Sequence, residues 1–287
     1  MADGDAAGRG DRRAVGELGF VAGGRAASST PPGRRDRRVG LENGAVCASV
    51  RRDLDWEGCF NARDLGGLAT VDGGQTRRGV LVRSDALDGL TSAGWAALLD
   101  HGVRTVIDLR NDDEIGRDVA PRPSVVTTIH LPRDGMEDRE FWDVWQNGPQ
   151  FGTPLYFRPH LERFPERSAR VIAAIADAQP GGVLFHCAGG RDRAGQIAML
   201  VLVLVGVATE EIVADYERST ERLQACYGAR GQVDQGELIE RFLDSRGTTA
   251  REVLMAMINS VDVRATLRAG GLQDPEVTAL RARLLEI

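Results

Sequence analysis

The stretch from residue 182 to 205 constrains the fold more than any other part of the chain. It joins a short apolar run, GVLFHC (182–187), through a turn with two glycines to a largely apolar run that ends at Val205. The first run has the length and composition of a buried strand. The second has those of a helix buried on all sides. A strand that leads through a glycine turn into a buried helix is typical of α/β proteins.

The remainder of the chain alternates in the same way. β-Branched and apolar runs predict further strands at 80–83, 103–110 and 127–132. Helical patterns, some with capping residues, occupy 92–102, 111–117, 155–178, 194–205, a stretch from Thr209, 236–245, 249–260 and 275–286. We therefore predict an α/β fold, with a mostly parallel central sheet flanked by helices and a helical C-terminal part.

Composition excludes several classes of protein. The 287 residues carry 36 basic and 42 acidic side chains, and this acidic balance argues against general nucleic-acid binding. The longest apolar stretch, 197–208, is about half the length of a membrane span. The N-terminus lacks the apolar run of a secretory signal, and the four cysteines are sparse. We expect a cytoplasmic protein with reduced thiols. All 36 cations are arginine, which excludes lysine chemistry.

Residues 1–45 differ from the rest of the chain. They contain ten glycines, eight arginines, six acids and few large apolar side chains. Such a segment buries too little apolar surface to offset its ordering entropy, so we predict a disordered tail over 1–45 and one catalytic domain over 46–287. A basic tether to an acidic partner is the functional alternative. A wrongly assigned start codon would also produce such a segment.

The turn after the strand at 182–187 has the features of a phosphate site. Cys187 ends the strand, and Arg193 begins the helix six residues later. Successive backbone N–H groups in such a loop can point inward as an anion nest, to which the helix adds its positive N-terminal end. The expected phosphate-binding loop consists of Ala188, Gly189, Gly190, Arg191 and Ala194.

The same positive field favours ionisation of the Cys187 thiol. A thiolate at this position can attack phosphorus and form a phosphocysteine that water later hydrolyses. Arg193 would bind two phosphate oxygens with its fork, and Asp192 is the nearest candidate for the acid that protonates the leaving oxygen. His186 would bond to the loop backbone and orient Cys187. This chemistry requires neither a metal nor another cofactor.

The Cys-x5-Arg pattern resembles the cysteine-dependent tyrosine-phosphatase superfamily, and in particular a bacterial branch whose loop is HCxxGKDRTG. Four further segments resemble motifs of that branch in the same order: NARDLGG (61–67), RGVLVRSDAL (78–87), DLRNDDE (108–114) and ADYERS (214–219). The resemblance covers residues 60–220. It implies a tyrosine-phosphatase-like fold with Cys187 as nucleophile, Arg193 as the phosphate-binding arginine and Asp192 as general acid.

The resemblance leaves the substrate open. Members of the branch act on phosphotyrosine, some on phosphoserine or phosphothreonine, and some on phosphoinositides. We predict a protein-tyrosine phosphatase whose partner is a phosphorylated protein. One alternative is a phosphoinositide phosphatase, because Arg191 adds positive charge at the expected rim of the pocket. The other alternative is a phospho-binding module with weak turnover. The sequence does not determine the oligomeric state.

The sequence departs from the branch at three positions. Arg191 replaces a lysine, Ala194 a hydroxyl residue, and Ala62 a phenylalanine. In the branch, that hydroxyl donates to the cysteine sulfur and helps it leave the phosphoenzyme. The presence of Ala194 therefore predicts slower hydrolysis of the phosphocysteine.

Several other residues are secondary candidates. The aromatic side chains of 141–157 form either a small satellite core or a lid over the pocket, and we favour the core. Acids near them compete with Asp192 as general acid: Asp134, Asp138 and Asp143. Arg63 is a candidate for contact with the pocket, whereas Asp64 and Asp108 are expected to brace the sheet through ion pairs. Plain thiols are expected at Cys47, Cys59 and Cys226, with a resolving cysteine for Cys187 as the alternative.

Overall fold

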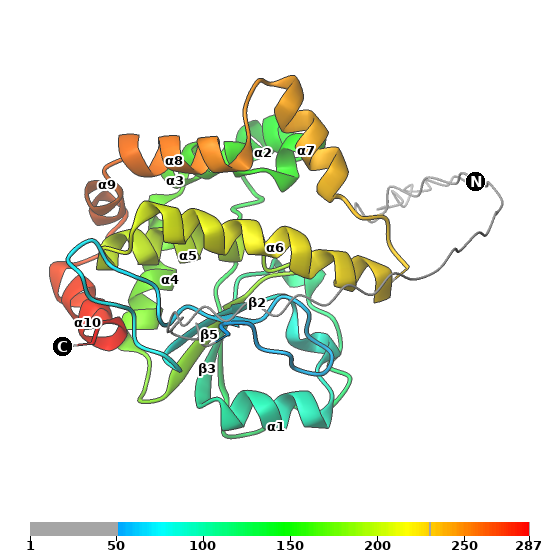
Figure 1. Cartoon of the computed structure of the whole chain (residues 1–287), viewed down its shortest axis with the longest axis vertical. Coiled ribbons are helices and arrows are strands. Elements are labelled where there is room, and N and C mark those ends of the chain that lie inside the picture. Colours follow the sequence, from blue (N-terminus) through cyan, green and yellow to red (C-terminus); the bar gives the residue numbers. More distant parts are fainter. Residues whose placement is uncertain (1–50, 230, 287) are drawn as a thin grey trace, which may run out of the picture. The chain divides into compact units, whose positions relative to one another are not determined.

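A five-stranded sheet forms the centre of the domain in the computed structural model, which describes residues 51–229 and 231–286 (Figure 1). The predicted tail over 1–45 and Cys47 lie outside the described residues, so the domain boundary at 46 stays a prediction. The strands lie in the order β1 (Arg63–Asp64), β2 (Leu81–Ser84), β5 (Gly182–His186), β3 (Val103–Asp108) and β4 (Thr127–His130). All neighbours are parallel except β1, which pairs antiparallel with β2. The prediction of a mostly parallel sheet is confirmed.

All four predicted strands are present, with small differences at their ends. The strand predicted over 103–110 stops at Asp108, because the Asp108 carboxylate accepts the backbone N–H of Arg110 and turns the chain. The strand predicted over 127–132 stops at His130, shortly before Pro132, which has no N–H to donate. The two-residue β1 was not predicted, since it is too short to show an alternating pattern.

Helices cover both faces of the sheet, as predicted (Figure 1). One face carries α1 (Ser92–Asp100), which Thr91 caps by accepting the N–H of Gly94. The other helices are α2 (Arg139–Trp145), α3 (Phe157–Arg163), α4 (Pro165–Asp177), α5 (Arg193–Val205), α6 (Thr209–Ala229), α7 (Gly236–Ser245), α8 (Ala250–Ser260), α9 (Val263–Ala269) and α10 (Asp274–Leu284). Short 3-10 helices lie at η1 (Leu87–Gly89), η2 (Asp112–Glu114), η3 (Pro149–Gly152) and η4 (Pro154–Tyr156).

The single helix predicted over 155–178 is wrong. The chain leaves helical geometry at Phe164, with φ −130° and ψ 52°, and divides the segment into α3 and α4. Pro165 explains the break, because its ring disfavours the helical conformation of the residue before it and fits the first position of a new helix. Neither α2 nor α9 was predicted; each is only seven residues long.

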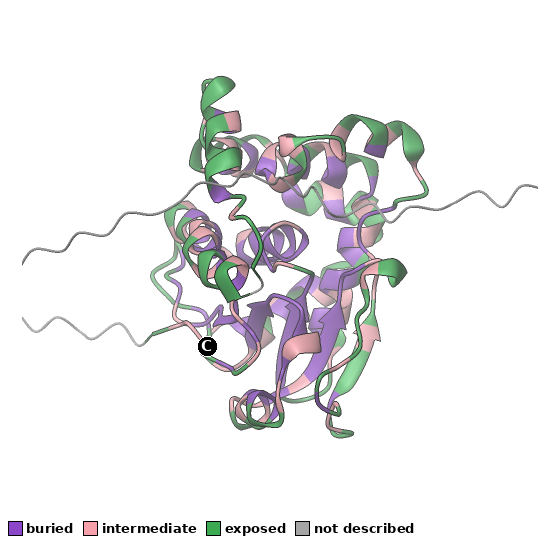
Figure 2. Ribbon diagram, turned by 90° about the vertical axis from the view of Figure 1, so that its right-hand side faces the viewer, coloured by how far each residue is buried: buried purple, intermediate pink, exposed green. Residues whose placement is uncertain are grey.

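The alternation of side chains along β5 separates two hydrophobic cores. Leu184 points to the side of α1 and packs in a core with Trp95 and Leu98. Val183 and Phe185 point to the opposite side, into the larger core formed with α4, α5 and the C-terminal helices. The central strands are almost wholly buried, whereas β4 at the edge is largely exposed (Figure 2). Burial on both faces fixes the position of the residue that follows β5.

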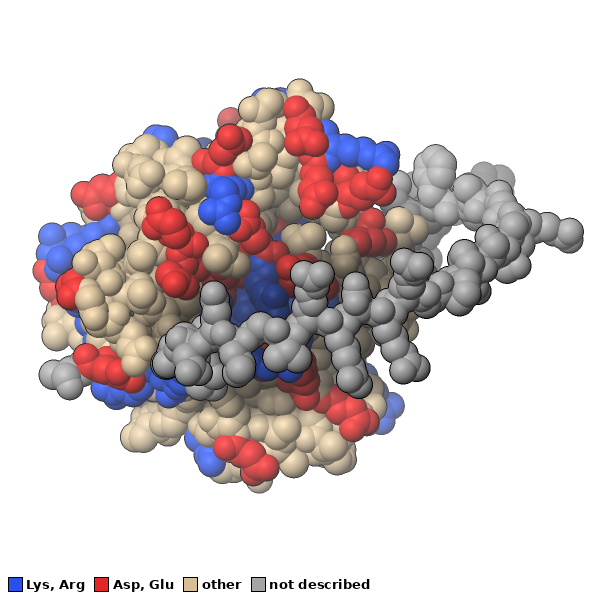
Figure 3. Space-filling view, viewed as in Figure 1, with Lys and Arg blue, Asp and Glu red and all other residues tan. Residues whose placement is uncertain are grey.

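Two surface properties bear on the expectations from composition. In the described part of the chain, no helix is both long and apolar enough to cross a membrane. Acidic and basic side chains are interspersed on the face shown in Figure 3. Many of them pair, as Arg251 does with Glu217 and Arg218 with Glu221.

Candidate active site

The predicted phosphate-binding loop connects β5 to α5. Cys187 follows the last residue of β5, and α5 begins at Arg193. The thiol is only 3% exposed, and its Sγ accepts the backbone N–H of Gly190 at 3.2 Å. The loop therefore curls around the sulfur at the carboxyl end of the sheet, which is where ligands bind in open α/β folds.

The carbonyl groups of the loop are bonded on its outer side. The Ala188 carbonyl accepts the N–H of Ala86 at 3.0 Å, the Gly189 carbonyl accepts Asn61 Nδ2 at 2.9 Å, and the Gly190 carbonyl accepts Arg83 Nη2 at 2.6 Å. Because the N–H and C=O of a peptide unit point in opposite directions, these bonds favour an inner position for the N–H groups of the same peptide units, and the Gly190 N–H does meet the sulfur. This arrangement is the one that an anion nest requires.

Gly190 is required in this loop by two features of its backbone. Its φ is +71°, which L side chains rarely adopt. A Cβ on this residue would also lie 2.5 Å from the carbonyl oxygen of Ser84. The loop can approach the end of β2 this closely only with glycine.

A buried ion-pair network holds the loop from behind. Asp215 on α6 accepts Arg63 Nε at 3.0 Å and Arg83 Nη1 at 2.7 Å. Burial opposes ionisation of Asp215, but the charges of Arg63 and Arg83 hold its pKa well below the usual value. Arg63 also donates to Asn61 Oδ1 at 2.6 Å and to Ser219 Oγ at 2.9 Å. The residues in the segments 61–67, 78–87 and 214–219 thus position the loop.

This network corrects one expectation and supports another. Arg63 does not reach the pocket, because its guanidinium is fully buried and is engaged by Asp215, Asn61 and Ser219. Asp64 is structural, since its carboxylate accepts the N–H groups of Gly66 and Gly79 at 2.8 Å each.

Two carboxylates orient the guanidinium of Arg193. Glu114, at the end of η2, accepts hydrogen bonds from both terminal nitrogens of Arg193. Arg193 Nη2 lies 2.6 Å from Oε1, and Nη1 donates to Oε2. Arg193 Nη1 also lies 3.1 Å from Asp134 Oδ2. Burial opposes ionisation of Glu114, but Arg193 keeps its pKa below the usual value. We did not predict this role for Glu114 from the sequence. The feature that could have indicated it is the place of Glu114 at the end of the DLRNDDE segment.

The structure separates the four candidate acids. Asp134 lies beside Arg193, is fully buried, and also accepts Asn111 Nδ2 at 2.9 Å. Burial raises the pKa of Asp134, although Arg193 acts in the opposite direction. Asp192 precedes α5 and lies 3.3 Å from Arg191 Nε, with a quarter of its side chain exposed. Asp138 instead caps α2 and pairs with Arg163, and Asp143 is exposed on α2. Only Asp134 and Asp192 are in the surroundings of the loop.

The aromatic residues of 141–157 do not form a separate satellite core. Trp142, Tyr156 and Phe157 are buried in the larger core. The indole Nε1 of Trp142 donates to the carbonyl oxygens of Asp134 at 3.0 Å and Gly135 at 3.1 Å. The aromatic cluster therefore supports the loop that carries Asp134.

We expected Arg191 at the open rim of the pocket, but the structure buries it. Its side chain is about nine-tenths buried and pairs with Asp192. A Cβ added to Gly152 would lie 3.0 Å from Arg191 Nη2, so η3 lies directly over the guanidinium. Folding of the 149–156 segment over the loop brought about this burial, and nothing in the local sequence around Arg191 indicates it.

His186 and Ala194 occupy the expected positions. His186 Nδ1 lies 3.4 Å from the carbonyl oxygen of Cys187, and Nε2 lies 3.6 Å from Asp108 Oδ2. Burial lowers the pKa of His186 to about 4, so the imidazole is neutral at pH 7. Ala194 is fully buried in the first turn of α5.

Cys59 and Cys226 are both buried. Burial and the neighbouring Asp85 raise the pKa of Cys59 well above its usual value, and its Sγ donates to Asp85 Oδ1 at 2.8 Å. A thiol held in its protonated form is a poor partner for disulfide exchange with Cys187.

In the described range, no cluster of three or more His, Cys, Asp or Glu residues is suited to hold a metal ion.

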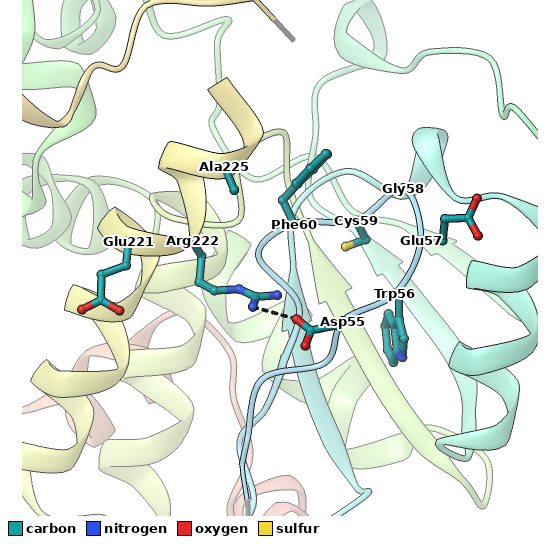
Figure 4. Close-up of a pocket in the computed structure, with 9 residues that line it drawn as sticks. All are labelled: Asp55, Trp56, Glu57, Gly58, Cys59, Phe60, Glu221, Arg222 and Ala225. Carbon is teal, nitrogen blue, oxygen red and sulfur yellow. Dashed lines mark hydrogen bonds and ion pairs between the residues drawn. The ribbon is translucent and has the colours of Figure 1, made fainter. Parts of the chain in front are cut away.

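A hollow of about 560 Å³ lies between the segment 55–60 and α6 (Figure 4). Arg222 of α6 points across it and pairs with Asp55 at 2.9 Å. Its lining residues are Asp55, Trp56, Glu57, Gly58, Cys59, Phe60, Glu221, Arg222 and Ala225. None of them belongs to the catalytic loop, so this hollow is distinct from the phosphate cradle.

Comparisons with known proteins agree with this geometry. The model of the tyrosine phosphatase family matches residues 54–286. The chain is 32% identical over 184 residues to a Cupriavidus necator protein named as a candidate tyrosine-protein phosphatase, with 62% of this chain and 67% of that protein covered. It is 31% identical over 193 residues to a triple specificity protein phosphatase of Mycobacterium tuberculosis, covering 57% of this chain and 68% of that one. A tyrosine-protein phosphatase of Nostoc commune is 30% identical over 217 residues, covering 71% and 73%.

These matches confirm the resemblance found in the sequence and the prediction of a phosphatase enzyme, whose substrates are phosphorylated molecules. They extend beyond the 60–220 range of the resemblance to the C-terminal helices. The chain belongs to the tyrosine phosphatase family.

Proposed function

We propose that the protein hydrolyses phosphotyrosine in proteins through a phosphocysteine intermediate on Cys187. The observation that carries the proposal is the contact between the Cys187 Sγ and the Gly190 N–H, at the floor of a loop whose carbonyls at 188–190 are bonded to neighbouring segments. Arg193 begins the adjoining helix, where its guanidinium and the helix N-terminus both favour an anion.

The reaction proceeds in two displacements. The Cys187 thiolate attacks phosphorus opposite the tyrosyl oxygen, so that a sulfur–phosphorus bond forms as the phosphorus–oxygen bond breaks. The loop N–H groups and Arg193 stabilise the charge on the transferring phosphoryl group. A carboxylic acid gives its proton to the leaving tyrosyl oxygen. The resulting carboxylate then takes a proton from water, which attacks phosphorus and releases phosphate and the thiolate.

We assign the acid role to Asp192, with Asp134 as the alternative. Asp192 belongs to the loop itself, and its carboxylate is partly exposed. Asp134 has a pKa raised by burial, which suits a proton donor, but its Oδ2 is engaged by Asn111 and Arg193. We therefore propose that Asp134 mainly orients Arg193.

The two alternatives to a protein phosphatase have less support. A phosphoinositide phosphatase would use Arg191 for additional phosphates, but that guanidinium is buried and paired with Asp192. A phospho-binding module would not need the acid beside the thiol. The name of the Mycobacterium tuberculosis relative indicates that a related chain acts on three classes of substrate, so we include phosphoserine and phosphothreonine as secondary substrates.

Hydrolysis of an aryl phosphate in the presence of a chelator tests the proposal. We expect turnover by the wild-type protein and none by Cys187→Ser, with Cys226→Ser as the matched control that retains activity. Activity that survives in Cys187→Ser would overturn the mechanism. An inactive wild-type protein that still binds phosphotyrosine peptides would favour the binding module. Parallel assays with phosphopeptides and phosphoinositide vesicles would rank the substrate classes.

A further inference from the structure

Arg133 carries an unusual buried charge next to the site. It follows β4 and directly precedes Asp134. Its side chain is 0% exposed, and its Nη2 donates to Ser168 Oγ at 3.0 Å. Its Nε and Nη1 are buried without a hydrogen-bond partner among the described residues. A guanidinium taken out of water with two unsatisfied donors is destabilising, so its retention calls for a reason other than packing.

The surroundings of Arg133 connect it to the catalytic loop. Its backbone N–H donates to the Leu109 carbonyl at 3.3 Å, and the Leu109 N–H donates in turn to the carbonyl of His186, the residue before Cys187, at 2.9 Å. Burial lowers the pKa of Arg133 to about 10, so the group stays cationic at pH 7. The neighbouring His160 is kept neutral, because burial and Arg133 lower its pKa well below the usual value. The titratable and charged groups around Arg133 and Cys187 are thus Tyr156, His160, His186, Glu114, Asp134, Asp192 and Arg193.

The charge balance of the site shows what Arg133 adds. Arg193 is paired with Glu114 and Asp134, and Arg191 is paired with Asp192. These pairs leave little net positive charge for a thiolate, and still less for a doubly charged phosphate monoester. Arg133 has no ion pair with a carboxylate in the described part of the chain. Its side-chain hydrogen bond goes to the Ser168 hydroxyl. Its charge is therefore the one in this cluster that no contacting acid offsets.

We propose that Arg133 is a positioning residue that stabilises the Cys187 thiolate and the bound phosphoryl group through its buried charge. It acts through the electrostatic field and touches no reacting atom. In a low-dielectric interior such a charge is weakly screened, so its effect reaches past the first layer of contacts. The inference rests on the proposed function for its catalytic consequence, but its effect on the thiol does not depend on turnover.

The test compares Arg133→Met with Arg133→Lys and with Arg170→Met, which removes an exposed arginine from α4. The first measurement is the rate of alkylation of Cys187 by iodoacetamide against pH, followed on the Cys187 peptide by mass spectrometry. We expect the midpoint of this profile to rise by about one unit in Arg133→Met, which is a tenfold smaller thiolate fraction below the midpoint. Arg133→Lys should restore most of the shift, and Arg170→Met should match the wild type.

The second measurement is protection of Cys187 from iodoacetamide by inorganic phosphate, and the third is kcat/KM for an aryl phosphate. Arg133→Met should need about tenfold more phosphate and should lose about tenfold in kcat/KM, while its thermal stability stays equal or rises because a buried unpaired charge is gone. An unchanged alkylation midpoint in folded Arg133→Met would overturn the proposal, as would a shift that Arg133→Lys does not reduce. If no variant turns over substrate, the proposed function fails, but the alkylation and protection data still decide the role of Arg133.

Discussion

At the scale of single residues, the environments of two carboxyl groups divide the work of the site. Asp134 is sealed behind Arg193 and held by Trp142 through its backbone carbonyl. Asp192 stands on the loop beside Arg191 and is partly exposed. Two acids placed so differently are expected to have different roles in the same reaction.

A comparison of leaving groups assigns the acid. Asp192→Asn should lose about 10²-fold or more in kcat on phosphotyrosine, whose oxygen needs a proton, and much less on an aryl phosphate with an acidic leaving group. Asp134→Asn should lower kcat on both substrates to a similar extent, because it disturbs the orientation of Arg193. The reverse pattern would transfer the acid role to Asp134.

Ala194 affects the second displacement. It is buried at the start of α5, where the related branch has a hydroxyl that donates to the sulfur. We expect Ala194→Thr to speed hydrolysis of the phosphocysteine several-fold and to shrink the burst seen by rapid quench. Ala194→Val, similar in shape but without the hydroxyl, is the control. An equal burst and turnover in Ala194→Thr and wild type would remove Ala194 from the account.

At the scale of elements, the catalytic loop has its shape because its neighbours hold its carbonyls. Arg83 comes from β2, the Asn61 side chain comes from the segment just before β1, and α6 provides the carboxylate that fixes Arg83. The loop is thus positioned by three segments that are distant in sequence.

Substitution of Gly190 tests this close packing. Gly190→Ala should unfold the loop locally, with at least a tenfold loss of kcat/KM, because both the positive φ and the approach to Ser84 oppose a side chain. Gly73 is the control, with φ +87° and nothing within 4 Å of an added Cβ. Gly73→Ala should cost only about 1–2 kcal/mol of unfolding free energy and leave activity intact. Equal effects of the two substitutions would show that the contact with β2 is unimportant.

At the scale of the whole molecule, the sequence predicted the layers well and the closure of the site poorly. The buried strands and the segment 193–205 were recognisable because their apolar runs are determined by burial on both faces of the sheet. Cys187, Asp192 and Arg193 were recognisable because they share one short loop. Glu114 lies in the recognisable DLRNDDE segment, but its pairing with Arg193 arises only through folding, and the sequence around Arg133 contains no motif that indicates its place beside the site. The burial of Arg191 likewise depends on the distant segment 149–156.

Acid stability should follow the network centred on Asp215. The arginines lower the folded pKa of Asp215 below its unfolded value, so its stabilising contribution is complete above about pH 4 and is lost progressively as the pH falls from there toward the folded pKa. Asp215→Asn should lower the free energy of unfolding by about 3–5 kcal/mol at pH 7, since it leaves buried arginines uncompensated. Denaturant unfolding at pH 7 and pH 3 measures this, with the exposed Asp100→Asn as control. A uniform loss at both pH values would contradict the linkage.

The phosphocysteine is the most direct test of the central claim. The reaction with an aryl phosphate is quenched in acid during turnover. Mass spectrometry of the peptide that contains Cys187 then measures the phosphocysteine. We expect a phosphoryl group on Cys187 that accumulates within the first turnover, disappears when substrate is exhausted, and is absent from Cys187→Ser. Turnover with no phosphoryl group on Cys187, or with the group on another residue, would contradict it.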